Sequence, residues 1–360
     1  MELFGFDLFQ VIWFWLIALL IGGYFVLDGF DLGAGALYPF IAKNEKDKAI
    51  VRRSIGPVWD GNEVWLLTAG GALFAAFPLA YATTFSGFYL AIMLVLFCLI
   101  VRAVSLEFRS RDKKWKGLWD VLFFLGSALP ALLLGVAAGN VLNGVPLAEA
   151  GAVGTGLLNE GIKLSAGDVL VNIPVIDLVI RPLPLVCGVL GLVLFLAQGA
   201  SWIALKAPLK SELHKKAAKL RMPLQLVAIV VFALATVLVL LVVKPEMAEV
   251  LGIARYVLAV LVVLVLVVSI FMRKNDVMAF LAQSAAVLLL PFLWAASQFP
   301  YLVPATQGKS IDIAMAASMG DTLFIMTLIT IVGVPLVLFY HFLIYRSFRG
   351  RVKDEDLTSY

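Results

Sequence analysis

The chain has 360 residues, of which 62% are hydrophobic and 14% are charged, and its formal net charge is +4. A soluble domain carries nearer a quarter charged residues, so this composition excludes an ordinary soluble enzyme. Apolar runs of about 18 residues or more, long enough to cross a hydrocarbon core, recur along the sequence, and no alternating ten-residue pattern indicates an outer-membrane barrel. The sequence therefore predicts an all-α polytopic membrane protein with no soluble domain.

Nine transmembrane helices are predicted in chain order. The first is longer than one crossing needs, so it must tilt, kink or protrude. The seventh and eighth are separated only by RKND at 273–276, which predicts a tight hairpin. The predicted spans are 8–39, 56–77, 82–104, 119–142, 183–205, 223–243, 255–272, 277–298 and 319–346.

The basic residues predict the orientation of these helices. The segments after the first, third, fifth and seventh spans, together with the C-terminal tail, hold 22 of the 28 Lys and Arg residues. Such an excess marks the cytoplasmic side of a membrane, so the N-terminus is expected outside and the C-terminus in the cytoplasm. This placement accounts for the net positive charge, and no nucleic-acid partner is expected.

Loop lengths suggest two four-helix bundles with a peripheral ninth helix. The connector 206–222 is expected to be solvated, and a basic amphipathic helix on the membrane surface is the alternative. The predicted units are 1–142 as the first bundle, 143–182 as an extracytoplasmic loop, 183–298 as the second bundle, and 299–360 as the ninth helix and cytoplasmic tail.

Two pairs of carboxylates lie inside predicted spans. Asp28 and Asp31 are three residues apart on one face of the first helix, and Asp60 and Glu63 have the same spacing in the second. Both pairs fall toward the cytoplasmic side. Ionisable groups inside membrane helices are costly and indicate function. The four acids therefore predict the entrance to a proton path.

Structural roles compete with this interpretation. Asp60 follows Pro57 at a predicted helix start, where an acid is favoured by the helix dipole. Glu63 lies about 9 Å from the predicted helix start, where capping explains it less well. Asp28 could be held in a purely structural pair. Arg102, near the inner end of the third span, is the candidate ion-pair partner of one of these acids, or its side chain extends to the interface.

Neither a metal site nor a catalytic residue is predicted in this chain. The two histidines are His214, in a basic loop, and His341, near the inner end of the ninth span. No intramembrane histidine pair could clamp a haem, and Cys98 and Cys187 fall in apolar spans with no metal-ligand spacing. Any redox centre is therefore expected to be held mostly by another chain.

Two stretches resemble a known family. LDGFDLGAGALYPF at 27–40 and WDGNEVWLLTAGGALFAAFP at 59–78 are similar to subunit II of the cytochrome bd quinol oxidases. The second stretch is highly specific, whereas LAQGA at 196–200 and QFPYLVP at 298–304 match more loosely. The resemblance covers the chain nearly end to end.

The resemblance implies a terminal oxidase complex in the bacterial cytoplasmic membrane. Such complexes oxidise quinol, reduce oxygen to water and generate proton motive force by taking the protons from the cytoplasm. Two haems b and one haem d are expected in the partner, subunit I, and a small third subunit is compatible with the resemblance. Some family members hold a quinone or a lipid in subunit II. In the family, the acid equivalent to Asp60 is assigned to a proton path. Asp28, in the DGFD motif, looks like a second residue of that path.

Two other classes of function remain open from the residues alone. A proton- or cation-coupled secondary transporter would use Asp28, Asp31 and Asp60 to bind the coupling ion and would work without a partner chain. An inert scaffold for a haem subunit would keep full turnover when every acid is neutralised.

Overall fold

The computed structural model describes residues 2–149, 169–171, 181–242 and 251–357. The long helices are α1 Leu8–Ile41, α3 Trp59–Ala76, α5 Tyr89–Arg111, α6 Lys116–Asn143, α8 Pro182–Lys206, α9 Glu212–Val242, α10 Gly252–Phe271, α11 Asp276–Gln298 and α13 Gly320–Ser347. Shorter helices are α2 Glu45–Ile55, α4 Pro78–Gly87, η2 Met272–Lys274, α12 Ile313–Ala316 and η3 Asp354–Leu357.

Eight of the described helices are long and apolar enough to cross a membrane. They coincide with all the predicted spans except the second, so the prediction of an all-α polytopic membrane protein is confirmed. The second predicted span corresponds to α3, which is 18 residues long and starts with the polar sequence WDGNE. This polar first turn lowers the mean hydropathy of α3, and the helix is therefore not among the eight.

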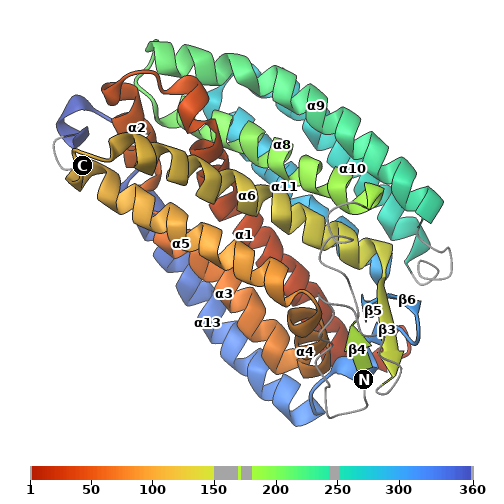
Figure 1. The fold of residues 1–360 in the computed structure, drawn as a ribbon. Coiled ribbons are helices and arrows are strands. Elements are labelled where there is room, and N and C mark those ends of the chain that lie inside the picture. The colour runs from red at the N-terminus through yellow and green to blue at the C-terminus, as the bar shows by residue number, and fades with distance from the viewer. Residues whose placement is uncertain (1, 150–168, 172–180, 243–250, 358–360) are drawn as a thin grey trace.

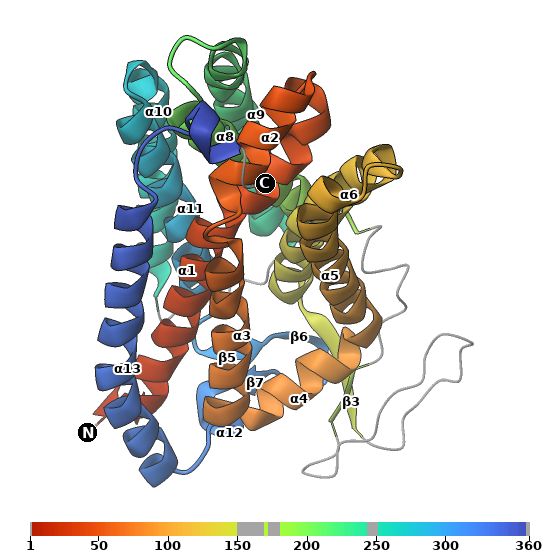
Figure 2. The ribbon, with the colours of Figure 1, turned by 90° about the vertical axis from the view of Figure 1, so that its left-hand side faces the viewer.

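The helices run side by side, with α1 near the centre (Figure 1). Helix α1 packs against α3, α6, α8 and α11, and α8 in turn packs against α6 and α9. The short strands gather at the end where the N-terminus lies, and α2 and the C-terminus lie at the opposite end (Figures 1 and 2). Helix α13 runs along the edge beside α3 (Figure 2), and only 6% of its apolar window is buried, compared with 61% for α8.

The strands form small sheets at the N-terminal end. β1 (Glu2–Leu3) pairs with β2 (Phe6–Asp7), and β5 (Tyr301–Val303) pairs with β7 (Ile311–Asp312), both antiparallel. β3 (Val145–Glu149) pairs antiparallel with β4 (Val169–Val171) and parallel with β6 (Ala305–Gln307). Most of the predicted loop 143–182 lies outside the described residues.

Local chemistry explains where several helices begin. Asp7 caps α1 by accepting a hydrogen bond from the backbone N–H of Phe9, as expected for an acidic N-cap. Asn275 accepts from the first N–H groups of α11, directly after η2. The tight hairpin predicted at 273–276 is thereby confirmed.

Two predicted boundaries are wrong. The third span was expected to begin at 82, but the chain forms a separate helix, α4, that starts at Pro78, and α5 begins only at Tyr89. Proline has no N–H to donate and is favoured in the first turn of a helix, so Pro78 starts a new helix after Phe77. The connector 206–222 is not a solvated loop, because α9 begins at Glu212 and continues into the predicted sixth span.

Close packing around α1 depends on glycine. A Cβ atom added to Gly33 would overlap the backbone carbonyl of Phe195 in α8. In the same way, a Cβ atom on Gly126 of α6 would lie 2.7 Å from the backbone nitrogen of Arg102 in α5. Small residues let membrane helices approach closely. These two glycines therefore bring the backbones of α8 and α6 close to the helices that carry Asp31 and Arg102.

Candidate functional site

The candidate site is centred on Arg102 of α5, whose side chain is only 2% exposed. Its Nη2 donates to Oδ1 of Asp28 on α1 at 2.7 Å and also pairs with Oε1 of Glu63 on α3. Asp28 is fully buried, whereas the Glu63 side chain is 26% exposed. Removing one partner of a buried ion pair leaves an uncompensated charge. These two pairs therefore tie three separate helices together.

Asp31 is connected to this cluster through α3 rather than through Arg102. Nδ2 of Asn62 donates to Oδ2 of Asp31 at 2.7 Å and to the carbonyl of Leu27 at 3.1 Å. The hydroxyl of Tyr345 on α13 donates to Oδ1 of Asn62 at 2.9 Å. Both Asp31 and Asn62 are fully buried. These contacts fix the orientation of the Asn62 amide between α1 and α13.

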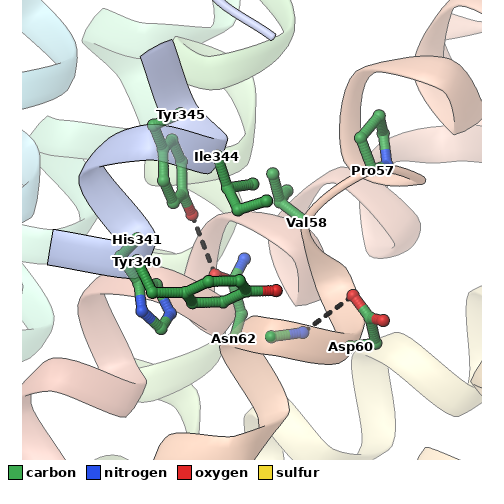
Figure 3. A pocket seen from close by; sticks show the side chains of 9 residues that line it. Pro57, Val58, Asp60, Asn62, Tyr340, His341, Ile344 and Tyr345 are labelled. Atoms are coloured by element: carbon green, nitrogen blue, oxygen red, sulfur yellow. Dashed lines mark hydrogen bonds between the residues drawn. The ribbon is translucent and has the colours of Figure 1, made fainter. Parts of the chain in front are cut away.

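Asp60 lies apart from the buried acids, in the exposed first turn of α3. Its Oδ1 accepts the backbone N–H of Gly61 at 2.8 Å, so the side chain does serve the start of the helix. It lines a hollow of about 10 Å³ together with Asn62, His341 and Tyr345 (Figure 3). A hollow of this size can hold about one water molecule. Asp60 and the Asn62 amide therefore face the same small polar hollow.

His341 of α13 forms one wall of this hollow. Its Nε2 lies 3.2 Å from Nε1 of Trp65, which carries a hydrogen and must donate, and its Nδ1 lies 3.0 Å from the carbonyl of Val337. A neutral imidazole with its hydrogen on Nδ1 satisfies both contacts. His341 is thereby held between α3 and α13.

Several buried polar atoms around the site have no hydrogen-bond partner in the part of the chain that is described. Buried polar atoms are generally paired with protein or with ordered water, so their concentration here sets this region apart from the apolar core. These atoms are Tyr24 Oη, Asp28 Oδ2, Asp31 Oδ1, Arg102 Nε and Nη1, and Gln198 Oε1.

A second ionic network ties together the start of α2, the end of α5 and the start of α6. Arg109 donates to both carboxylate oxygens of Glu45 at 2.9 Å and, through Nε, to Asp120 at 2.8 Å. Lys48 also pairs with Asp120, at 2.6 Å. The Arg109 guanidinium lowers the pKa of Glu45 to about 2. The network holds α2 against α5 and α6 and is separate from the acids around Arg102.

The structure brings together three of the four predicted acids, Asp28, Asp31 and Glu63, around Arg102 and Asn62. Within the described residues Asp60 forms no hydrogen bond or ion pair with Arg102, and it lies in the neighbouring hollow. Sequence reasoning did not select Asn62 or Tyr345. Asn62 carried a signal, since it is a polar residue in the same helical turn as two acids, but Tyr345 lies 283 positions away and carried none.

The histidine and cysteine side chains of the described residues bear on whether this chain holds a haem. Both ring nitrogens of His341 are engaged within the protein, and Nε2 of His214 contacts Asp276 at 3.0 Å. Cys98 is buried among apolar residues and Cys187 is half-buried. Within the described residues, no group of three or more His, Cys, Asp or Glu could hold a metal ion. These residues do not fit a haem-ligating pair.

The fold and the site together define a multi-pass membrane protein with a buried ionic cluster. The sequence profile of the family described as cytochrome bd terminal oxidase subunit II matches residues 9–348. Cytochrome bd-I ubiquinol oxidase subunit 2 of Escherichia coli K12 is 32% identical, over 98% of this chain and 97% of the relative. Cytochrome bd ubiquinol oxidase subunit 2 of Bacillus subtilis is also 32% identical, over 97% and 98%.

The chain therefore belongs to the cytochrome bd terminal oxidase subunit II family. A chain in the structure of bd oxidase from Geobacillus thermodenitrificans has a TM-score of 0.75 and 17% identity, and the match covers 95% of this chain and 99% of that one. This likeness supports the same fold. Membership in the family and the eight apolar helices identify a multi-pass bacterial membrane protein that is a subunit of an oxidoreductase complex.

Proposed function

We propose that this chain is the haem-free subunit of a quinol oxidase that reduces oxygen to water, and that it supplies part of the proton path from the cytoplasm. In this proposal α3 also crosses the membrane, which raises the number of crossings to nine, and the N-terminus lies outside and the C-terminus inside. The helices divide into the two bundles and the peripheral ninth helix expected from loop lengths. Matches to ubiquinol oxidase subunits over nearly the whole chain support the quinol substrate.

The haems belong to subunit I in this proposal. Two haems b and one haem d are expected there from the resemblance to the family. A stand-alone transporter is not favoured, because the family profile and the relatives that cover the whole chain are oxidase subunits.

The observation that carries the proton-path proposal is the charge balance of the buried cluster. Asp28 and Glu63 pair with a single cation, Arg102, and Asp31 joins this cluster through Asn62, so the fully ionised cluster would hold a net charge of −2. An unbalanced charge away from water is costly, and taking up protons reduces it. The cluster therefore has the capacity to accept and release protons that a relay needs.

The proposed direction of transfer runs from the surface inward. Asp60 is exposed and collects protons at the hollow, while Glu63, one helical turn further along α3, is partly exposed and contacts Arg102. Asp28 and Asp31 form the buried end. Protons cross between these groups through water, which the unpaired atoms of Asp28 and Asp31 would bind. The amide of Asn62 orients Asp31 and is not itself a proton carrier.

The test uses the complex purified with its haem subunit. Asp60→Asn, Glu63→Gln and Asp31→Asn are compared with Glu107→Gln, an exposed carboxylate on α5 outside the cluster. We expect full haem content in all four complexes, with quinol-dependent oxygen uptake lowered in the first three only. Normal turnover in all three variants would contradict the proton path and leave a structural role for the cluster.

A second readout separates proton delivery from general damage. Proton uptake after a pulse of oxygen is followed with a pH indicator in the fully reduced complex. Neutralising a residue of the path slows this uptake while the binding of oxygen to the reduced haem is unchanged. A variant that slows both processes equally indicates a disturbed complex rather than a blocked path.

A further inference from the structure

A basic cavity lies at the end of the molecule where the C-terminus is found. Its volume is about 120 Å³, and it is enclosed by the ends of α2 and α8 and by the segment that follows α13. That segment passes over α2 and α8 at this end (Figure 2). The charged side chains that line the cavity are Arg53, Lys206, Arg349, Arg351 and Asp356.

Lys206 is the unusual member of this group. The residue is only 8% exposed, and its Nζ donates to the carbonyl of Phe348 at 2.7 Å and lies 4.8 Å from the ring centroid of Trp202. Among the described residues no carboxylate lies within 4.0 Å of this nitrogen. A buried ammonium group is normally paired with an anion. Lys206 therefore presents an uncompensated positive charge at the wall of the cavity.

The other cations add to this charge. Arg351 is matched, because its Nη2 donates to Asp276 at 2.6 Å and its Nη1 donates to the carbonyls of Ala204 and Ala207. Arg349 is exposed, and its side chain has no partner in the described part of the chain. When Asp276 is counted against Arg351, the lining side chains carry a formal charge of +2. This excess of positive charge beside a buried lysine is suited to binding an anion.

We propose that this cavity binds a phosphate group, either the headgroup of an anionic phospholipid or free inorganic phosphate. Lysine binds phosphate as a point charge, and arginine donates to phosphate oxygens in a fork. The cavity is also lined by Ser54, Ser347, Trp202 and Phe348. The bound phosphate compensates Lys206 and holds the C-terminal segment against α2 and α8.

This site is independent of the proposed proton path. The cavity shares Pro57, Val58 and Tyr345 with the hollow beside Asp60, so the two are neighbours. No group in the proton-path proposal supplies charge to the phosphate site. Failure of either proposal leaves the other intact.

The test is a titration of the delipidated complex, purified with its haem subunit, with two probes in separate experiments. Dioleoylphosphatidylglycerol is counted by native mass spectrometry, and inorganic phosphate is followed by titration calorimetry. Lys206→Gln and Arg349→Gln are compared with Lys274→Gln, which removes one exposed cation in the hairpin before α11. Because Arg349 is exposed, its replacement is expected to leave the fold intact.

We expect one equivalent of phosphatidylglycerol to bind, with the affinity about tenfold weaker in both cavity variants and unchanged in Lys274→Gln. Binding of inorganic phosphate alone, with the same dependence on Lys206 and Arg349, identifies free phosphate as the ligand and supports the site. Binding of neither probe to the unmodified complex overturns the proposal. An unchanged affinity for both probes in Arg349→Gln also overturns it.

Discussion

Replacing Arg102 by glutamine tests how far the buried ion pairs hold the helices together. The Arg102 and Asp28 side chains are 2% and 0% exposed, and their closest atoms are 2.7 Å apart. Removing the guanidinium leaves Asp28 and Glu63 facing each other without a cation. The loss of one partner of a buried pair costs about 3–5 kcal/mol. We expect the free energy of unfolding to fall by roughly this amount.

The assay is thermal unfolding of the purified complex, followed by circular dichroism and by haem absorbance. In chains of 150–250 residues, 1 kcal/mol shifts the melting temperature by about 2–4 °C, so we expect Arg102→Gln to lower it by at least about 5 °C. Asp28→Asn placed in the same chain removes one uncompensated charge. The double variant is therefore expected to be more stable than Arg102→Gln alone.

The double-mutant comparison decides whether charge is the cause. If Arg102→Gln is equally destabilising with Asp28 and with Asn at that position, the effect does not come from the ion pair. The reasoning from burial and pairing is then refuted. Loss of packing by the long arginine side chain would remain as the cause.

Two further perturbations have clear expected outcomes. Gly33→Ala places a Cβ atom against the carbonyl of Phe195 and is expected to reduce the yield of assembled complex. The control is Gly70→Ala, which is expected to leave the yield unchanged because nothing lies within 4 Å of the added Cβ atom. Equal yields of the two variants would contradict the close approach of α1 and α8. The contact with Arg109 lowers the pKa of Glu45 to about 2, so its contribution to stability is present above the ordinary carboxyl pKa of about 4.3 and is lost as the pH falls toward 2. The check is to compare the melting temperatures of Glu45→Gln and of the unmodified complex between pH 7 and pH 3. The difference between the two melting temperatures should shrink below about pH 4. It should be small at every pH, because the Glu45 side chain is 63% exposed.

The positions of the helices follow largely from local sequence. Runs of apolar residues are costly to leave in water, and their backbone groups must be paired inside a membrane, so helices over these runs are nearly obligatory. The predicted first span, 8–39, differs from α1 by two residues at one end. Predicted boundaries are wrong where tertiary packing decides the local structure. The basic segment from Glu212 onward forms the first turns of α9, because Leu213 and Ala217 are buried against the rest of the protein.

The chemistry of the buried cluster was only partly visible in the sequence. The spacing of Asp28 and Asp31 and the polar turn of α3 follow from local pattern. The contacts of Arg102 with both Asp28 and Glu63 do not follow from local pattern, because α1, α3 and α5 meet only when the helices pack. Separation along the chain therefore limited what could be predicted.

The sequence by itself determined the membrane class, the family motifs and the residues with unusual charge, because hydropathy and short-range spacing are local properties. Only the tertiary structure decided which charges meet. Tyr345 of α13 contacts Asn62, and Lys206 meets the segment after α13, across 283 and 142 positions of chain. Such contacts depend on how whole helices pack, and no local pattern encodes the resulting pairs of atoms.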